Sequence, residues 1–395
     1  MKLILSILAL LSLQEVLSDD VGRAYEWKDI KLVGVKTSTY NPEDVIPTGV
    51  AHDTESRTLF FGIPRIFPKV PITVAELNTR TYNSAELRSP PLNIFSGKSS
   101  KPLTSVYQPV IDDCRRLWIL DVGIVQSPSE QKKYPIKNPA LIAYDLTKQN
   151  YPEIHRYELT GEVAKTPLGY GGFAVDVINP KTGCGHRDET YVYIANFVEN
   201  AIIVYDMQKR DAWNFKDDSF KPEGTSTFTH NGKEHTIQAG IFGIALGDRN
   251  KEGHRPAYYL AGSSTKLYSV NTKSLKKKGT ALKPKLLGDR GSKTEAIALA
   301  YDPETKVIFF TEADSGKVSC WNTKKELKPE NVGVIYSSPR FNFGTDIMVD
   351  SEGVLWFMAN GQPPIDEKVV YDKPRIRVLK VNTKVAIKGK KCEIK

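Results

Sequence analysis

Residues 341–364, FNFGTDIMVDSEGVLWFMANGQPP, contain the pattern that the rest of the chain repeats. An alternating segment ends at Asp350, a Ser-Glu-Gly turn follows at 351–353, and an apolar run typical of a β-strand occupies 354–358. The stretch therefore predicts two short antiparallel strands joined by a tight turn.

Small and polar residues lie where these two strands begin and end. Thr345 is at the start of the first strand and Asn360 follows the second, and in an antiparallel pair these ends are neighbours. Phe341 and Phe343 come just before them. Polar groups beside aromatic rings indicate the edge of a ligand site. The alternative is structural: Thr345 and Asn360 bond only to nearby backbone, and Phe343 belongs to the core.

Five other segments have the same layout, in which a first strand near a Gly or Pro is followed by a turn and two more apolar strands. Six copies with a period of about 60 residues predict a closed, all-β fold, the six-bladed β-propeller with a central ligand-binding channel. A strand predicted over residues 25–35 would complete the last blade and join the two ends of the chain. The other five first strands are predicted at 47–53, 108–112, 172–176, 240–246 and 295–302.

Residues 1–18 have the pattern of a signal peptide, with Lys2, an apolar run over 3–13 and a small residue, Ser18, at the expected cleavage point. An uncleaved anchor is the alternative. No later segment approaches the roughly 20 apolar residues needed to cross a bilayer. We therefore expect a secreted, extracellular protein with one domain, residues 19–395, that does not associate with a membrane.

Four cysteines, an even number in a chain expected to be secreted, predict two disulfides with three connectivities open. Cys114 and Cys184 fall in equivalent loops of neighbouring predicted blades. This placement favours Cys114–Cys184 and leaves Cys320–Cys392 to fix the C-terminal tail. No CxxC motif occurs, so a zinc site is not expected.

The chain has 55 Lys and Arg against 46 Asp and Glu, a formal charge of +9. The basic residues are scattered, and their densest run, 276–278, is typical of a solvated turn. A surface that binds anionic polymers through this charge is an alternative function. No nucleic-acid-binding module is recognisable, and no nucleic-acid partner is expected.

Six segments carry wording that is typical of a known family: VIDDCRRLWILDVG (110–123), PALIAYDL (139–146), YVYIANFVENAIIVYD (191–206), GIFGIAL (240–246), VSCWN (318–322) and FGTDIMVDSEGVLWFMANG (343–361). They resemble the insect yellow/major royal jelly protein family, and among its branches the yellow-related salivary proteins of blood-feeding sand flies. The similarity covers almost the whole predicted mature chain in the family's order. The resemblance implies a salivary protein that binds small biogenic amines in the propeller channel: serotonin, histamine, dopamine, noradrenaline and adrenaline. We expect a monomer without a cofactor.

The first strand of each propeller blade lines the axis, so the starts of these strands converge on one opening. An arylalkylamine needs apolar or aromatic walls for its ring and hydrogen-bond acceptors for its ammonium, because a buried, unpaired cation is very costly. The residues predicted at this opening are Thr48, Gln108, Phe173, Phe242, Glu295 and Thr345, with Asn196, Ser263 and Asn360 from the ends of second strands.

Three acceptors suit the three N–H donors of an ammonium: the Thr345 hydroxyl, the Asn360 side-chain oxygen and a backbone carbonyl near Gln362. The family resemblance points to the same Thr345 and Asn360. Phe343 and Phe341 are candidates for ring stacking or cation–π contact with the ligand.

Glu295 has two interpretations, direct pairing with an ammonium or neutralisation by Lys293. Glu295, Asn196 and Asn360 could also imitate the calcium cage of lactone-hydrolysing propellers, since calcium prefers oxygen ligands. Some members of the resembled family are associated with dopachrome conversion. Because no GxSxG or HExxH motif occurs, we expect binding without catalysis and without a metal.

Overall fold

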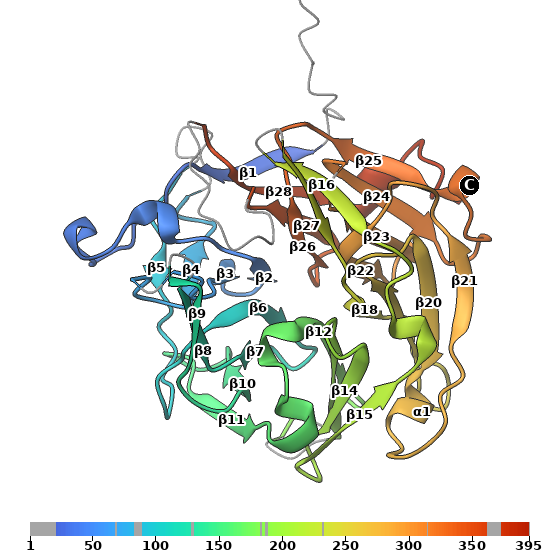
Figure 1. The fold of residues 1–395 in the computed structure, drawn as a ribbon, viewed down its shortest axis with the longest axis horizontal. Coiled ribbons are helices and arrows are strands. Elements are labelled where there is room, and N and C mark those ends of the chain that lie inside the picture. The colour runs from blue at the N-terminus through green and yellow to red at the C-terminus, as the bar shows by residue number, and fades with distance from the viewer. Residues whose placement is uncertain are drawn as a thin grey trace, which may run out of the picture.

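The computed structural model describes residues 21–67, 69–82, 89–127, 130–181, 184–185, 189–230, 233–313, 315–361 and 373–394. Six four-stranded antiparallel sheets surround a central axis as the blades of a propeller (Figure 1). The predicted all-β six-bladed propeller is confirmed. The predicted signal peptide and Gln362 lie outside the described residues.

The blades follow the order of the chain, and each runs from an innermost first strand to an outermost fourth strand. Blade 1 contains β2 (Gly49–Asp53), β3 (Thr58–Gly62), β4 (Val74–Asn78) and β5 (Asn93–Ile94), and blade 2 contains β6 (Val106–Ile111), β7 (Arg116–Asp121), β10 (Ala140–Asp145) and β11 (Glu153–Glu158). Blade 3 contains β12 (Tyr170–Val177), β13 (Thr190–Asn196), β14 (Ala201–Asp206) and β15 (Asp211–Lys216), and blade 4 contains β18 (Ile241–Leu246), β19 (Pro256–Ala261), β20 (Lys266–Asn271) and β21 (Lys285–Asp289). Blade 5 contains β22 (Ala296–Asp302), β23 (Val307–Glu312), β24 (Lys317–Asn322) and β25 (Gly333–Ser337), and blade 6 contains β26 (Gly344–Val349), β27 (Val354–Ala359), β28 (Ile376–Asn382) and β1 (Gly22–Trp27).

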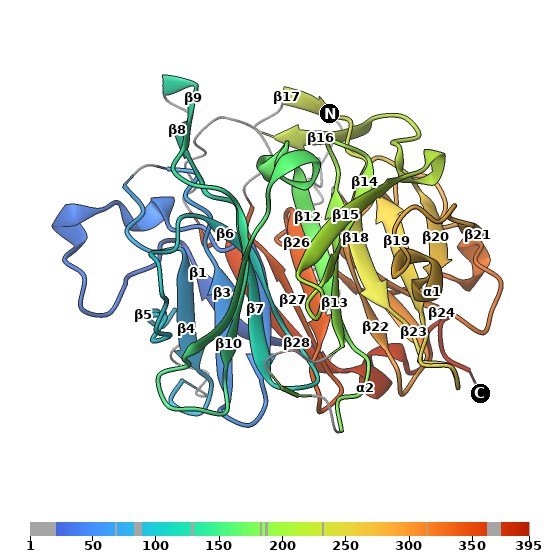
Figure 2. The same ribbon diagram turned by 90° about the horizontal axis from the view of Figure 1, so that it is seen from below.

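Two hairpins extend from one end of the ring, which we call the upper face: β8 (Ile124–Ser127) with β9 (Lys132–Pro135), and β16 (Ser226–His230) with β17 (Lys233–Ile237). Figure 2 shows these hairpins at the top and the short helix α2 (Thr383–Ile387) at the opposite, lower end. The other short helix is α1 (Thr272–Leu275).

The ring is closed by the N-terminal strand, as predicted, but with different bounds. β1 pairs antiparallel with β28 and ends at Trp27, whereas the sequence predicted a strand over 25–35. The reason lies beyond Trp27, where the chain leaves blade 6: the Ile30 amide donates to the Pro42 carbonyl, and Leu32 forms a bridge with Leu92 beside blade 1. The apolar residues after Trp27 therefore cover a neighbouring blade.

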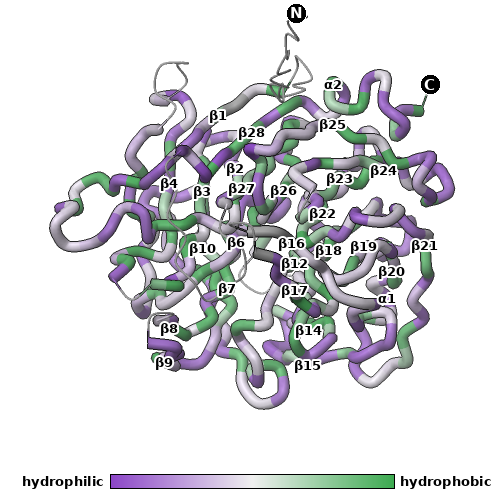
Figure 3. The backbone as a smooth tube through the Cα atoms, turned by 45° about the horizontal axis from the view of Figure 1, so that its top comes forward, coloured by the Kyte–Doolittle hydropathy of each residue, from purple (hydrophilic) through white to green (hydrophobic). Residues whose placement is uncertain are grey.

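Hydrophobic residues are concentrated in the strands, where they pack between adjacent blades, and hydrophilic residues dominate the outer loops (Figure 3). Clusters of buried side chains extend from each blade to the next around the ring, which is how stacked sheets share one core. No helix within the described ranges is both long enough and apolar enough to cross a bilayer.

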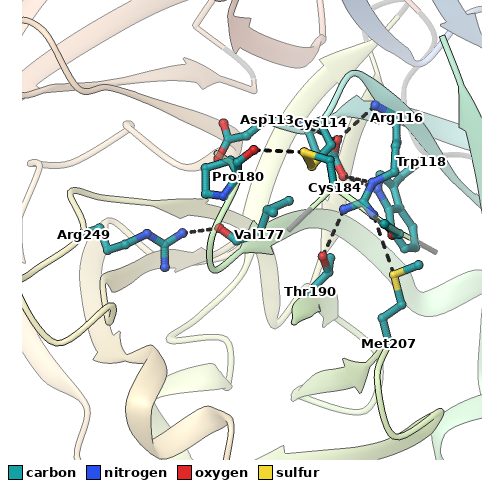
Figure 4. Close-up of a disulfide and its surroundings, with 12 residues drawn as sticks. Asp113, Cys114, Arg116, Trp118, Val177, Pro180, Cys184, Thr190, Met207 and Arg249 are labelled. Carbon is teal, nitrogen blue, oxygen red and sulfur yellow. Dashed lines mark hydrogen bonds and ion pairs between the residues drawn. A yellow bond between two sulfur atoms is a disulfide. The ribbon is translucent and has the colours of Figure 1, made fainter. Parts of the chain in front are cut away.

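Both predicted disulfides are confirmed. Cys114, between β6 and β7, is bonded to Cys184, between β12 and β13, and so links blades 2 and 3 (Figure 4). Cys320 of β24 is bonded to Cys392, which fixes the C-terminal tail against blade 5.

A buried ion pair lies beside the first disulfide. Arg116, only 2% exposed, donates from Nε to Asp112 Oδ2 over 2.7 Å. The same carboxylate oxygen accepts from Trp118 Nε1 at 2.7 Å, and Arg116 Nη2 reaches Thr190 Oγ1 of blade 3 at 3.0 Å (Figure 4). The pair therefore connects the core of blade 2 to the neighbouring blade.

Candidate functional site

The first strands of five of the six blades are irregular near the point where they begin. In β6, β12, β18, β22 and β26 the pairing with the second strand shifts, whereas β2 pairs regularly. A β-bulge re-aims the side chains of the residues it contains, and bulges are common beside functional sites. The residues inside these shifts are Tyr107 and Gln108, Gly171 and Gly172, Phe242, Ile297, and Thr345.

Most of these bulge residues line one cavity of about 160 Å³ on the axis, which we call the upper pocket. Its position on the upper face is fixed by Tyr107, whose hydroxyl accepts a hydrogen bond from Gln126 Nε2 of the β8–β9 hairpin at 2.7 Å. The walls are mainly apolar and aromatic, with few polar groups, as in sites for small organic ligands. The lining residues are Thr48, Ile66, Tyr107, Gln108, Tyr170, Gly171, Phe242, Ile297, Phe343, Thr345 and Asn360.

Thr345 and Asn360 bring polar groups to this pocket, as the sequence predicts. Thr345 is 8% exposed, and its Oγ1 is buried without a hydrogen-bond partner in the part of the chain that the structure describes. A buried hydroxyl without a partner is unusual and costly, and this oxygen keeps its capacity to accept a hydrogen bond. Asn360 is also buried, and its Nδ2 donates to the Pro47 carbonyl over 3.0 Å, which orients the amide.

Aromatic rings form two sides of the upper pocket. Phe242 stacks on Phe197, with ring centroids 4.7 Å apart and planes 14° from parallel. Phe343 is buried beside Ile297 and Phe242, and its backbone has a φ of 58°, a left-handed conformation rarely adopted by a bulky residue. The Phe343 carbonyl accepts from the Asn360 amide at 3.3 Å, so the start of β26 and the end of β27 are neighbours, as predicted.

Two predicted aromatic residues lie elsewhere. Phe341 is completely buried in the core between blades 5 and 6, where its ring packs against Tyr336 and Phe357 with centroids 5.5 Å apart in both cases. It therefore does not line the upper pocket. Phe173 lines a second cavity of about 280 Å³ further along the axis, which we call the central channel.

Three predicted polar residues do not reach the upper pocket. Asn196 Oδ1 accepts from the Val198 and Glu199 amides, so this side chain shapes a turn. Ser263 is held by hydrogen bonds within blade 4 and its loops. Glu295 is half-buried just before β22 and is not among the residues that line the upper pocket. Strand ends converge on the axis, but a side chain there points into the opening only where a bulge or turn directs it.

A family model described as "Major royal jelly protein" matches residues 104–392. The chain belongs to the major royal jelly protein family. It is 74% identical over 395 residues to "Yellow-related salivary protein M35" of Phlebotomus duboscqi, with 100% of both chains covered. It is 61% identical over 397 residues to "Yellow-related salivary protein M10" of the same species and 52% identical over 401 residues to "Yellow-related salivary protein LJM11" of Lutzomyia longipalpis, again with 100% of both chains covered.

Among solved structures, a Bacteroides thetaiotaomicron protein described as of unknown function has a TM-score of 0.53 at 10% identity. The match covers 92% of this chain and 75% of that chain. At this identity the likeness shows the propeller fold alone.

This royal jelly family member also has a carboxyl group on its axis that the sequence patterns did not indicate. Asp346 lines the central channel, and its Oδ1 accepts from Gln108 Nε2 at 3.2 Å. Burial raises the pKa of Asp346 from 3.8 to about 7. Strict alternation along β26 would place Asp346 on the face opposite Thr345, and the bulge between Gly344 and Asp346 removes that alternation.

The lower end of the axis opens into a larger cavity of about 830 Å³, which we call the lower cavity. Its charged lining is largely paired: Asp53 with Arg115 at 2.8 Å, and His52 with Asp350 at 2.8 Å. Across the described residues, no group of three or more His, Cys, Asp or Glu side chains is placed to hold a metal ion.

Proposed function

We propose that this royal jelly family member is a secreted salivary protein that binds one small biogenic amine in the upper pocket. Binding lowers the free concentration of the amine and does not convert the amine chemically. The amines concerned are serotonin, histamine, dopamine, noradrenaline and adrenaline, mediators of host haemostasis and inflammation. The observation that carries the proposal is the buried, unpartnered Thr345 hydroxyl at an aromatic-walled cavity of about 160 Å³.

The pocket offers both parts of the recognition that an arylalkylamine requires. Its ring would lie against Phe242 and Phe343, where stacking or edge contacts contribute about 0.5–1.5 kcal/mol beyond burial. Its ammonium would donate to Thr345 Oγ1 and the Asn360 side-chain oxygen. The third acceptor that the sequence predicts, a backbone carbonyl near Gln362, lies outside the described residues. Neutral acceptors suffice for a cation only when most of its N–H donors are satisfied.

Secretion into saliva is supported by two observations. The similar proteins described above carry salivary protein in their names, and both disulfides of this chain suit an oxidising, extracellular compartment. A protein that acts by sequestration must be present in an amount similar to that of its ligand, because each protein molecule binds one amine. The proposal therefore requires affinity of about micromolar or better and an abundant protein.

Replacing Thr345 with valine is expected to weaken serotonin binding by about 1–3 kcal/mol, or about 5- to 150-fold, because the isosteric side chain cannot accept a charged donor. Isothermal titration calorimetry measures this change directly. The matched control is Thr54→Val in the lower cavity, where the Thr54 hydroxyl bonds to Ser351 Oγ at 2.7 Å. If serotonin affinity is unchanged in Thr345→Val but reduced in Thr54→Val, the binding site is at the opposite end of the propeller.

A further inference from the structure

Asp346 is a buried carboxylate, and each of its hydrogen-bond donors among the described residues is neutral. Its Oδ2 accepts from the Val50 amide at 2.8 Å, and its Oδ1 accepts from the Ile347 amide at 2.9 Å and from Gln108 Nε2 at 3.2 Å. These three donors satisfy the oxygens as hydrogen-bond acceptors, but none of the three carries a positive charge that would balance the carboxylate. Such a charge away from water is costly unless a cation lies nearby.

The central channel, which Asp346 lines, adjoins the upper pocket, because the two cavities share Gln108 and Ile297 in their walls. Gln108 lines both the upper pocket and the central channel, and its amide is the group between the pocket and Asp346. Thr345 in the pocket and Asp346 in the channel are consecutive residues, and both face the axis because of the bulge in β26. An ammonium bound to the Thr345 hydroxyl would therefore lie beside the residue that carries the Asp346 carboxylate.

Within the described part of the chain, the strands packed around β26 carry no Lys or Arg. These strands are β2, β22, β23 and β27, and the other inner strands, β6, β12 and β18, also lack both residue types. Arg255 does line the central channel, but it also lines the lower cavity and pairs with Asp176 at 3.2 Å. The other ionisable groups on these strands are Tyr107, Tyr170 and Asp176, then His52 and Asp53 towards the lower cavity, Tyr301 and Asp302 at the end of β22, and Glu312 at the end of β23. Glu312 accepts hydrogen bonds from Ser315 and Ser319, and Asp350 directly follows β26.

We propose that Asp346 is the counter-charge of the bound ammonium and makes the upper pocket select cations over neutral molecules of the same shape. The inference rests on the proposed amine-binding function and deepens it. Because Asp346 is buried, the attraction between its carboxylate and an ammonium is stronger than it would be in bulk water. Gln108 is then a positioning residue, since its Nε2 holds one carboxylate oxygen towards the pocket.

Titration of Asp346 makes the selection depend on pH. Because its pKa is raised to about 7, the carboxyl is charged above this pH and becomes neutral as the pH falls through it. An aliphatic ammonium keeps its proton to about pH 10. Amine affinity should therefore be constant at alkaline pH and decrease below about pH 7. Because the bound cation favours the ionised carboxyl, binding near pH 7 should release a fraction of a proton.

The test is calorimetric titration of the wild-type protein with serotonin at about pH 8.5 and about pH 5.5. We expect binding at least about fivefold weaker at the lower pH, and proton release near pH 7 when two buffers of different ionisation enthalpy are compared. The neutral probe 5-hydroxyindole, which lacks the ammonium, should bind more weakly and without this dependence. Serotonin binding that is saturable but independent of pH, without proton release, would overturn the role of Asp346 alone. No saturable binding at the higher pH would overturn the proposed function itself.

Asp346→Asn is expected to abolish the pH dependence and to weaken serotonin binding at the higher pH about tenfold. The matched control is His52→Gln at the lower cavity, which removes another titratable group near the axis and should keep the wild-type pH profile. A pH profile lost in His52→Gln and retained in Asp346→Asn would refute the assignment. If Asp346→Asn does not fold, the proton release of the wild-type protein decides the question.

Discussion

Replacing Asp112 with alanine is expected to lower the free energy of unfolding by about 3–5 kcal/mol, the cost of removing one partner from a buried ion pair. The Asp112 carboxylate accepts from Arg116 Nε and Trp118 Nε1, and also from the amides of Cys114 and Arg116. Without it, the Arg116 guanidinium stays in the core and loses the carboxylate that accepts from its Nε. Urea denaturation followed by circular dichroism measures the change.

The matched control is Glu158→Ala, which breaks an ion pair of similar length with Lys101, 2.7 Å, on the surface. Because both partners are exposed, the expected loss is below about 1 kcal/mol. Equal losses of unfolding free energy in the two variants would show that the burial of Asp112 and Arg116 does not govern their contribution to stability.

The double variant Thr345→Val with Asn360→Ala is expected to reduce serotonin affinity by about 2–5 kcal/mol, or about 30-fold to several thousand-fold. The two residues would share one ammonium, so their effects need not add. The measurement is calorimetric, with thermal unfolding to confirm that both proteins are folded.

Asn196→Ala provides the control for this double variant, because the two asparagines occupy similar positions in their blades. Asn196 is the last residue of β13, the second strand of blade 3, and Asn360 directly follows β27, the second strand of blade 6. The Asn196 amide oxygen bonds to the turn at Val198 and Glu199 and does not reach the upper pocket. We expect Asn196→Ala to lose stability with unchanged serotonin affinity. Full affinity in the double variant would remove Thr345 and Asn360 from the site.

The fold could be predicted from the sequence because one strand–turn–strand pattern, best seen over 341–364, recurs six times. Continuous apolar runs bury both faces of the inner strands between neighbouring sheets, and this packing favours a closed ring of sheets. The disulfide pairs followed from that ring, since Cys114 and Cys184 occupy equivalent loops of adjacent blades. The bounds of β1 were not predictable in the same way, because the apolar residues after Trp27 pack on blade 1 rather than extend the strand.

The site could be predicted only in part. Thr345, Asn360 and Phe343 line the upper pocket because strand ends converge on the axis. Phe341 belongs to the core, and Asp346 was missed. Both errors have one physical cause: local backbone geometry at the start of β26, including the positive φ of Phe343, redirects side chains that an alternating pattern would place on the other face.

A crystal structure of the protein with serotonin tests the central claim most directly. We predict one serotonin in the upper pocket, with its ammonium about 3 Å from Thr345 Oγ1 and its indole against Phe242. Serotonin in the lower cavity, or an upper pocket occupied by a metal ion while serotonin is absent, would contradict the account.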